Sequence, residues 1–433
     1  MGRVTGQGTT CPVVVVGVDA AGAPAYPAAV AALAGARLAV GAARHLAAVT
    51  LPDGCATVAL GPLAPALDRL AAAVADGVPS VVLASGDPGL FGIVRRLRAD
   101  GLPVRVLPAV SSVAAAFARA GLPWDGAAVV SAHGRDLRPA LNAARALPAV
   151  AVLTAPGAGA AEIGAGLVGW PRRLVVAEHL GTPAERVTET TPAEAAAATW
   201  ADPHVLLCLA DAAGDPAPTG AAVPTGAAAR TVAASPAGGA RADNQPAAAP
   251  AGGWALPEDA YAHRDSMITK AEVRALAVAR LRPRLGRLVW DVGAGSGSVG
   301  VECALLGAAV VAVERDPDAV DLVRRNAAAH GVDVGVVAGA APAALDGLPD
   351  PDAVFVGGGG LDVLAAVAAR EPARVVVTLA ALDRVAPALA LLRERGYRAD
   401  GVQLSAARLA DLPGGSVRLA ATNPVVVLTG EHP

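Results

Sequence analysis

The sequence predicts two α/β domains joined by a flexible linker, and three observations carry this prediction. From Cys11 to Asp211, and again from Trp254 onward, short Val- and Leu-rich runs alternate with alanine-rich stretches, as strands and helices do in α/β folds. Between them, residues 212–253 are mostly Ala, Pro, Gly and Thr, and have too few large apolar residues to form a core. The third observation is a glycine-rich turn at residues 293–297, between a predicted buried strand and a predicted helix.

The first domain, residues 11–211, is expected to have two lobes that divide at the turn-rich residues 120–126. The strands predicted for the first lobe are Val13–Val18, Leu38–Val40, Thr57–Leu60, Ser80–Ala84 and Val104–Leu107. Those predicted for the second lobe are Ala128–Ser131, Val150–Thr154, Leu174–Ala177 and Val205–Leu209.

The second domain, residues 254–433, is predicted to be Rossmann-like, with helices between most of its strands. Seven strands are predicted: Leu288–Val292, Val310–Glu314, Val334–Val337, Ala353–Val356, Arg374–Thr378, Gly401–Ser405 and Pro424–Thr429. We expect a mostly parallel sheet whose last two strands pair as an antiparallel hairpin.

The composition narrows the class of protein. Of 433 residues, 54% are hydrophobic but only 3% aromatic, so the cores are expected to be built from Val, Leu and Ala. The net charge of −3 gives no support for nucleic-acid binding. The four scattered cysteines form no metal-like pair, which favours free thiols and no metal. Because the apolar run at residues 13–18 is too short for a signal peptide, and no transmembrane stretch stands out, we expect a cytoplasmic protein without a membrane partner.

The glycine-rich turn predicts a nucleotide-like cofactor. Gly293, Gly295 and Gly297 allow positive φ and let a ligand approach the backbone, next to a helix N-terminus. Glu314 ends the following predicted strand, about 20 residues on, the usual distance for an acid that bonds ribose hydroxyls. With Asp291 in front, the turn resembles motif I of the Rossmann-like S-adenosylmethionine methyltransferases. A nicotinamide dinucleotide and a tight turn without a ligand are the alternatives.

A series of short motifs follows the predicted strands of the first half. Ser85-Gly86-Asp87-Pro88 leaves a strand, and Asp87 is expected to cap a helix with Pro88 at its first position. The series continues with Ser111-Ser112, Arg119-Ala-Gly121-Leu-Pro-Trp124, Ser131-Ala-His133-Gly-Arg135, Leu153-Thr154-Ala-Pro156-Gly157 and Ala177-Glu178-His-Leu-Gly181. In this order the motifs resemble the tetrapyrrole methylase family, in the branch that acts on corrin precursors.

The second half resembles the methyltransferase that acts together with this branch of the tetrapyrrole methylases in one step of cobalamin synthesis. The motifs that carry this resemblance are Met267-Ile-Thr269-Lys270, Asp291–Gly297, Glu314-Arg-Asp-Pro, Gly339-Ala-Ala341, Val356-Gly-Gly-Gly-Gly360, Ala407-Arg408 and Asn423-Pro424. The resemblance implies methylation of a tetrapyrrole at bridge carbons 5 and 15, loss of carbon dioxide from an acetate side chain, and S-adenosylmethionine as cofactor. We also expect a homo-oligomer.

The resemblance implies cofactor contacts from residues at the strand ends of both halves. In the first half these are Gly17, Ser85, Gly86, Asp87, Leu90, Ser111, Ser112 and Thr154. In the second half they are Thr269, Asp291, Gly293, Ala294, Gly295, Ser296, Gly297, Glu314 and Ala341. Two departures stand out: Asp19 occupies a position where the family usually has glycine, and residues 339–341 lack an acid often found there.

The residues expected to bind substrate carboxylates are positively charged or, in the case of His133, can become so by protonation. Lys270 is the one lysine of the sequence, which suggests a need for a compact ammonium beside Thr269; a chance surface charge is the alternative. The others are Arg119, His133, Arg135 and Arg408, each of which can equally be structural. No Ser–His–Asp or Cys–His constellation is apparent, so the catalytic residues are left open.

Two other classes of function compete. A class I methyltransferase acting on RNA or another small molecule would use the same second half, but residues 357–360 are four glycines where base-amino methylases have an Asn/Asp-Pro-Pro-aromatic run. A non-enzymatic cofactor-binding protein would be expected to have a degraded glycine loop, and residues 293–297 are intact.

Overall fold

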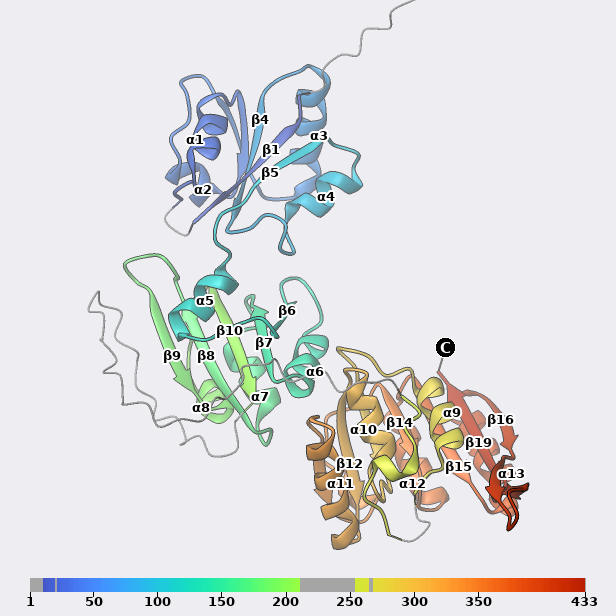
Figure 1. The fold of residues 1–433 in the computed structure, drawn as a ribbon. Coiled ribbons are helices and arrows are strands. Elements are labelled where there is room, and N and C mark those ends of the chain that lie inside the picture. Colours follow the sequence, from blue (N-terminus) through green and yellow to red (C-terminus); the bar gives the residue numbers. More distant parts are fainter. Residues whose placement is uncertain (1–10, 20–21, 211–253, 265–267, 433) are drawn as a thin grey trace, which may run out of the picture. The chain divides into compact units, whose positions relative to one another are not determined.

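The computed structural model describes residues 11–19, 22–210, 254–264 and 268–432. These residues form two compact units, one built around two sheets and the other around a third (Figure 1). The predicted linker, residues 212–253, and Met267 of the predicted cofactor motif lie outside the described residues. The fold class is thus α/β, as expected.

The first sheet is fully parallel, with strand order β3-β2-β4-β1-β5. Its strands are β1 (Val13–Val18), β2 (Leu38–Gly41), β3 (Ala56–Ala59), β4 (Ser80–Ser85) and β5 (Val104–Leu107). The helices are α1 (Pro27–Ala34), α2 (Ala43–Ala48), α3 (Leu63–Ala75) and α4 (Ile93–Ala99). The next helix, α5 (Ser112–Ala120), contacts β10 of the second sheet (Figure 1). Two apolar clusters bury β1: one contains Val13 and Val15, and the other contains Val16 and Val18. Burial by both clusters explains the uninterrupted apolar run of this strand.

The second sheet has the order β6-β7-β10-β8-β9, and β8 runs antiparallel to both of its neighbours. Its strands are β6 (Ala128–Ser131), β7 (Ala149–Leu153), β8 (Arg172–Glu178), β9 (Arg186–Thr190) and β10 (His204–Ala210). The helices are α6 (Arg138–Ala146), α7 (Ala160–Leu167) and α8 (Pro192–Ala197). Gly121, with φ of 68°, ends α5, which contacts β10 of this sheet. The break between lobes at residues 120–126 stays a prediction.

The third sheet has seven strands, in the order β13-β12-β11-β14-β15-β19-β16. They are β11 (Leu288–Val292), β12 (Ala309–Glu314), β13 (Gly335–Ala338), β14 (Ala353–Val356), β15 (Arg374–Leu379), β16 (Arg398–Leu404) and β19 (Val425–Glu431). The helices are α9 (Ala271–Leu281), α10 (Ser298–Leu305), α11 (Pro317–Ala329), α12 (Leu361–Ala368) and α13 (Val385–Glu394).

This sheet is mixed, which corrects the expectation of a mostly parallel sheet. The five strands from β13 to β15 are parallel, whereas β19 is antiparallel to both β15 and β16. The predicted hairpin pairing of the last two sheet strands is confirmed. Two antiparallel pairs result because β19 inserts between β15 and β16 instead of adding to an edge of the sheet.

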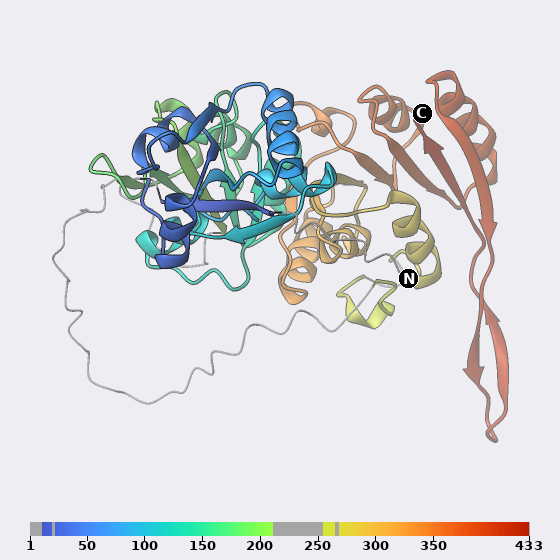
Figure 2. The same cartoon turned by 90° about the horizontal axis from the view of Figure 1, so that it is seen from above.

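A two-stranded ribbon, made of β17 (Ala407–Asp411) and β18 (Val417–Ala421), is absent from the sequence prediction. Figure 2 shows it as a narrow red hairpin reaching away from the seven-stranded sheet. Most of its side chains face solvent, so the ribbon lacks the buried apolar run that identifies a strand in sequence. Among the described residues, no helix has the length and apolar character to cross a membrane.

Candidate cofactor sites

The glycine-rich turn joins β11 to α10, as predicted. Gly293, Gly295 and Gly297 have φ of 72°, 56° and 73°, a region that favours glycine. A Cβ at Gly293 would lie 2.8 Å from the backbone N of Gly358, so the turn also meets the glycine run that follows β14. At Gly295 a Cβ would have no neighbour within 4 Å. A Cβ at Gly297 would lie 2.9 Å from Val323, so the turn is closed by packing at Gly293 and Gly297 and open at Gly295 between them.

Asp291 is a buried carboxylate directly beneath this turn. Its Oδ2 accepts a hydrogen bond of 2.8 Å from Gly300 N, at the start of α10. Its Oδ1 is buried and has no hydrogen-bond partner among the described residues. Burial raises the pKa of Asp291 to about 7, opposed by the Gly300 bond and increased by nearby Glu314. An unsatisfied buried oxygen of this kind calls for a ligand or a water molecule.

Glu314 ends β12 beside the turn. Its Oε2 accepts from Gly295 N at 2.8 Å, and its Oε1 accepts from the backbone N of Arg315 and Asp316 at 2.8 and 3.0 Å. The carbonyl of Glu314 accepts from Gly339 N, so the segment that contains Ala341 leaves β13 at the same edge of the sheet. The structure therefore brings together Asp291, the turn residues 293–297, Glu314 and the start of the 339–341 segment.

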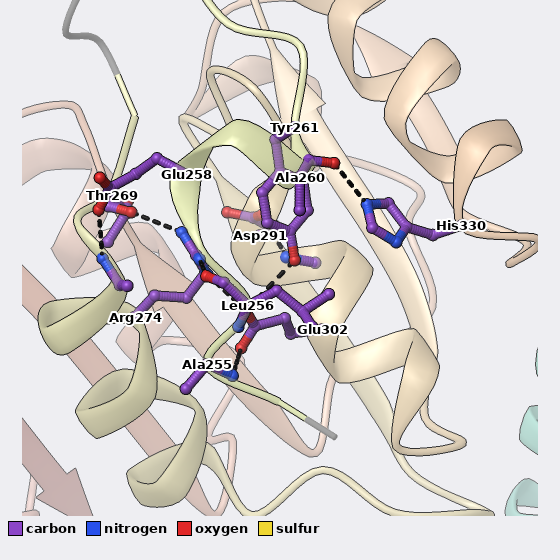
Figure 3. A network of polar contacts seen from close by, with 12 residues as sticks. Ala255, Leu256, Glu258, Ala260, Tyr261, Thr269, Arg274, Asp291, Glu302 and His330 are labelled. Atoms are coloured by element: carbon purple, nitrogen blue, oxygen red, sulfur yellow. Dashed lines mark hydrogen bonds and ion pairs between the residues drawn. The ribbon is translucent and has the colours of Figure 1, made fainter. Parts of the chain in front are cut away.

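A buried ion pair fixes the segment that carries Thr269 and Lys270 (Figure 3). Arg274 of α9 and Glu302 of α10 are fully buried, and Arg274 Nε donates to Glu302 Oε1 at 2.6 Å. Arg274 also donates to the carbonyl oxygen of Thr269 at 2.7 Å and to that of Leu256. Glu302 accepts from the backbone N of Ala255 and Leu256 and from the Tyr261 hydroxyl. The pair thus ties Ala255, Leu256, Tyr261 and Thr269 to two helices of the domain.

Sequence reasoning missed the role of this pair. The available signal was Glu302 between Val301 and Cys303 in an apolar helix, because a charged residue on such a face needs a partner. The two residues lie 28 positions apart, so the identity of the partner was not a local property of the sequence.

Arg408 was predicted to meet substrate carboxylates, but the structure pairs it with two glutamates of its own domain. Its guanidinium donates to Glu258 at 2.5 and 2.7 Å and to Glu272 at 2.9 and 2.7 Å. The hydrogen bond from Arg408 lowers the pKa of Glu258 to about 2, assisted by the bond from Ala271 N and opposed by burial. Arg408 therefore anchors the base of the β17–β18 ribbon to Glu258 and to the first turn of α9.

In the first sheet, the predicted cofactor residues also meet at the carboxyl ends of the strands. Gly86 N donates to Val18 O at 2.8 Å, and a Cβ at Gly17 would lie 2.2 Å from Gly86 O. A Cβ at Gly86 would lie 3.0 Å from the Cα of Ser111, whose hydroxyl caps α5. Gly17, Gly86 and Ser111, which precedes Ser112, therefore form one cluster from the ends of β1, β4 and β5.

The expected helix start at Asp87 and Pro88 is wrong. The Asp87 carboxylate accepts from Gly89 N at 2.8 Å, and Leu90 N donates to Asp87 O, which makes a local turn. Phe91 has φ of 53°, which interrupts a helix, and α4 begins only at Ile93. Asp87 and Leu90 thus lie in a loop after β4.

Asp19, the departure from the family pattern, is bonded within its own loop. Its Oδ1 accepts from Ala23 N at 2.8 Å, and its backbone N donates to Ala23 O at 3.0 Å. The carboxylate is therefore committed to closing the loop after β1.

The remaining predicted residues lie in or next to the second sheet. Thr154 follows β7, and its hydroxyl donates to His204 O at 2.5 Å. Arg119 of α5 pairs with Glu185 at 2.5 Å. Arg135 lies over the Phe91 ring at 5.6 Å, and His133 is exposed. Arg119 therefore has an internal carboxylate partner, as Arg408 does.

Comparison with known proteins defines the class. A family model described as Tetrapyrrole (Corrin/Porphyrin) Methylases matches residues 13–196, and one described as Precorrin methyltransferase domain matches residues 259–429. The chain is thus a fusion of a tetrapyrrole methylase domain and a precorrin methyltransferase domain. It is 38% identical over 334 residues to a precorrin-6Y C(5,15)-methyltransferase (decarboxylating) of Sinorhizobium sp, across 74% of this chain and 71% of the relative. The chain belongs to the precorrin-6Y C(5,15)-methyltransferase (decarboxylating) family.

Two further comparisons each cover less than half of the chain. A probable cobalt-precorrin-6B C(15)-methyltransferase (decarboxylating) of Pyrobaculum calidifontis is 38% identical over 184 residues, 40% of this chain and 94% of the relative. A solved structure of precorrin-6Y C5,15-methyltransferase from Geobacter metallireducens is 32% identical, covers 42% of this chain and 97% of its own, and has a TM-score of 0.38.

Proposed function

We propose that the chain methylates a corrin precursor of the precorrin-6Y type at carbons 5 and 15 and removes an acetate carboxyl group as carbon dioxide, in cobalamin biosynthesis. The observation that carries this proposal is the presence of two separate strand-end sites, one in each matched domain, in a chain of this family. One site includes Gly17, Gly86 and Ser111, and the other includes Asp291, Gly295 and Glu314.

S-Adenosylmethionine is the cofactor, and the residues of the second site fit it. The buried Oδ1 of Asp291 has no partner among the described residues, and Gly295 leaves an open approach beside it. An unpaired carboxylate suits a cofactor with a cationic end, and an acid at the end of the second strand suits ribose hydroxyls. Asp291, Gly295 and Glu314 would hold the cofactor, which supplies an electrophilic methyl group.

The chain's own task is to orient and to exclude water. A reduced tetrapyrrole has electron-rich bridge carbons that are nucleophiles themselves, so alignment supplies most of the reduction of the barrier. Decarboxylation requires a carboxylate removed from water next to an electron sink, which the imine system of the substrate provides. We assign methylation at carbon 15 and decarboxylation to the second domain, and methylation at carbon 5 to the first. The cytoplasmic location and the absence of nucleic-acid and membrane partners stay predictions from the sequence.

The test is the mass of the product formed by the purified full chain from a precorrin-6Y-type precursor and methyl-labelled S-adenosylmethionine. The expected product has gained two labelled methyl groups and lost one carbon dioxide. A product with a single methyl group, at saturating cofactor and long incubation, contradicts the proposal.

We further propose that the chain forms a homo-oligomer through the β17–β18 ribbon. Leu409 and Leu419 are directly paired across the ribbon and are 73% and 68% exposed. Paired, exposed leucines on a thin hairpin suit burial against a second copy of the same ribbon. Light scattering after size exclusion should show an oligomer for the chain and a smaller species for Leu409→Ser/Leu419→Ser. An unchanged mass for this variant contradicts the ribbon as the interface.

A further inference from the structure

A cluster of three polar side chains lies beside the N-terminal cofactor site, and only one of them, Ser85, is a predicted site residue. Arg44 and His45 belong to α2, which follows β2, and Ser85 ends β4. Because β2 and β4 are parallel neighbours, the start of α2 and Ser85 share the carboxyl edge of the first sheet. Gly86, next in the chain, contacts Gly17 and Ser111. Ligands of open α/β sheets bind at this edge.

The hydrogen bonds within this cluster have a defined direction. Arg44 Nε donates to His45 Nε2 at 3.3 Å, and Arg44 Nη2 donates to Ser85 Oγ at 3.3 Å. Ser85 Oγ lies 3.0 Å from the same His45 Nε2. Since a guanidinium can only donate, His45 Nε2 is the acceptor, and the ring proton belongs on Nδ1. The imidazole must therefore be neutral.

The surroundings of His45 maintain this neutral form. The side chain is buried, with 8% of its surface exposed. Burial lowers the pKa of His45, and the positive charge of Arg44 lowers it further. A buried neutral imidazole that accepts from Arg44 Nε and Ser85 acts as a fixed support for the guanidinium.

Arg44 itself is exposed and has no acidic partner among the described residues. Two of its five N–H groups go to His45 and Ser85, which leaves one on Nη2 and two on Nη1. Two of these three, one on each Nη, lie along the outer edge of the guanidinium, which can bind a carboxylate with two parallel hydrogen bonds. Arg119 and Arg408, by contrast, already pair with glutamates.

We propose that Arg44 binds a carboxylate side chain of the tetrapyrrole substrate in the N-terminal site, and that His45 and Ser85 are positioning residues that orient its guanidinium. This inference rests on the proposed function, because it takes the N-terminal domain to be a methylating site. It identifies the ligand as a polycarboxylate, whose acetate or propionate groups match the free edge of Arg44.

The test measures methylation at carbon 5, the step assigned to the N-terminal domain, by the full chain at increasing substrate concentration. Arg44→Ala should raise the KM of the N-terminal step about 10- to 100-fold, since charge-assisted bonds are lost, with a smaller change in kcat. Arg44→Lys keeps the charge but cannot form the two parallel bonds, so its KM should lie between those of wild type and Arg44→Ala. Added salt should raise the KM of wild type more than that of Arg44→Ala, because screening weakens a charge pair.

The positioning role is tested at His45. His45→Gln retains a hydrogen-bond acceptor, so its KM should stay within about threefold of wild type. His45→Phe has no acceptor, so its KM should approach that of Arg44→Ala. Arg69→Ala, which removes an exposed arginine of α3, is the matched control. An unchanged KM in Arg44→Ala overturns the inference, as does an equal loss of cofactor affinity, which would assign the cluster to the cofactor. If wild type gives no second methylation, the proposed function itself fails.

Discussion

The two cofactor sites differ at one buried acid, Asp291. In the second domain, the Oδ1 of Asp291 is buried without a partner among the described residues, whereas Glu314, at the end of the neighbouring strand, accepts from three backbone N–H groups. In the first domain, the acids of the corresponding loops are engaged locally, because Asp19 bonds Ala23 N and Asp87 bonds Gly89 N. An acid in a strand-end loop is therefore not enough to predict a ligand contact; the groups that its oxygens already bind decide.

The largest effect is expected at the buried Arg274–Glu302 pair of the second domain, which has no counterpart among the residues described at the first site. Arg274→Ala leaves Glu302 buried and unpaired, and should lower the free energy of unfolding of this domain by about 3–5 kcal/mol. Urea denaturation, fitted with one transition per unit, measures the loss. Arg280→Ala, on the same helix, is the control and should change the value by less than about 0.5 kcal/mol.

The double variant Arg274→Met/Glu302→Leu sharpens this test. It removes both charges, so it should be less destabilised than Arg274→Ala. A loss below about 1 kcal/mol in Arg274→Ala is incompatible with a fully buried pair.

Glu314→Ala tests whether the acid at the end of β12 bonds the cofactor. It removes the proposed bonds to the ribose hydroxyls, worth about 1.5–3 kcal/mol each. Because water can fill the space, the net loss of cofactor-binding free energy should be about 2–3 kcal/mol. S-Adenosylmethionine should then bind the C-terminal site roughly 30- to 150-fold more weakly, with the N-terminal site unchanged in calorimetry. NADH is the control ligand and should bind neither protein. A change within about twofold would mean that Glu314 only holds the turn.

The sequence predicted the second site better than the first because its geometry is local. Asp291, the turn at 293–297 and Glu314 follow from a buried strand, a helix start and the next strand. At Asp87 the same reasoning failed, since Gly89 and the positive φ of Phe91 turn the chain before a helix can begin.

Pairings between distant segments could not be predicted. Arg408 meets Glu258 across 150 positions, so nothing near Arg408 indicated that its guanidinium is engaged. The strands β9, β17 and β18 were missed because they alternate polar and apolar residues or face solvent. Strands buried on both sides, such as β11, were found from their apolar runs.

Asp291 is expected to make the free energy of unfolding of the second domain depend on pH. Its folded pKa, about 7, lies above the unfolded value of 3.8, so its contribution to stability is complete below about pH 4 and is lost as pH rises through 7. Without cofactor, the unfolding free energy of the second domain relative to Asp291→Asn should fall by about 2 kcal/mol between pH 5 and pH 7. Urea denaturation at both pH values measures the difference. A difference independent of pH would mean that Asp291 is charged throughout.

The smallest effect is expected at Asp19. Asp19→Asn keeps an oxygen that can accept from Ala23 N but removes the charge. Because that oxygen serves the loop, cofactor affinity at the N-terminal site should change by less than about 0.5 kcal/mol, or roughly twofold. Calorimetry with the C-terminal site disabled by Glu314→Ala isolates this value. A tenfold change in either direction would place the Asp19 charge at the cofactor.

The central claim is that each domain of the chain has its own S-adenosylmethionine site, one with a buried carboxyl oxygen of Asp291 that has no partner among the described residues, and one whose loop acids are bonded locally. Isothermal titration of the full chain with S-adenosylmethionine tests it most directly. Wild type should bind about two S-adenosylmethionine molecules per chain, and Glu314→Ala should weaken binding at one of the two sites. A stoichiometry near one in wild type, abolished by Glu314→Ala, would contradict it, because the N-terminal domain would then bind no cofactor.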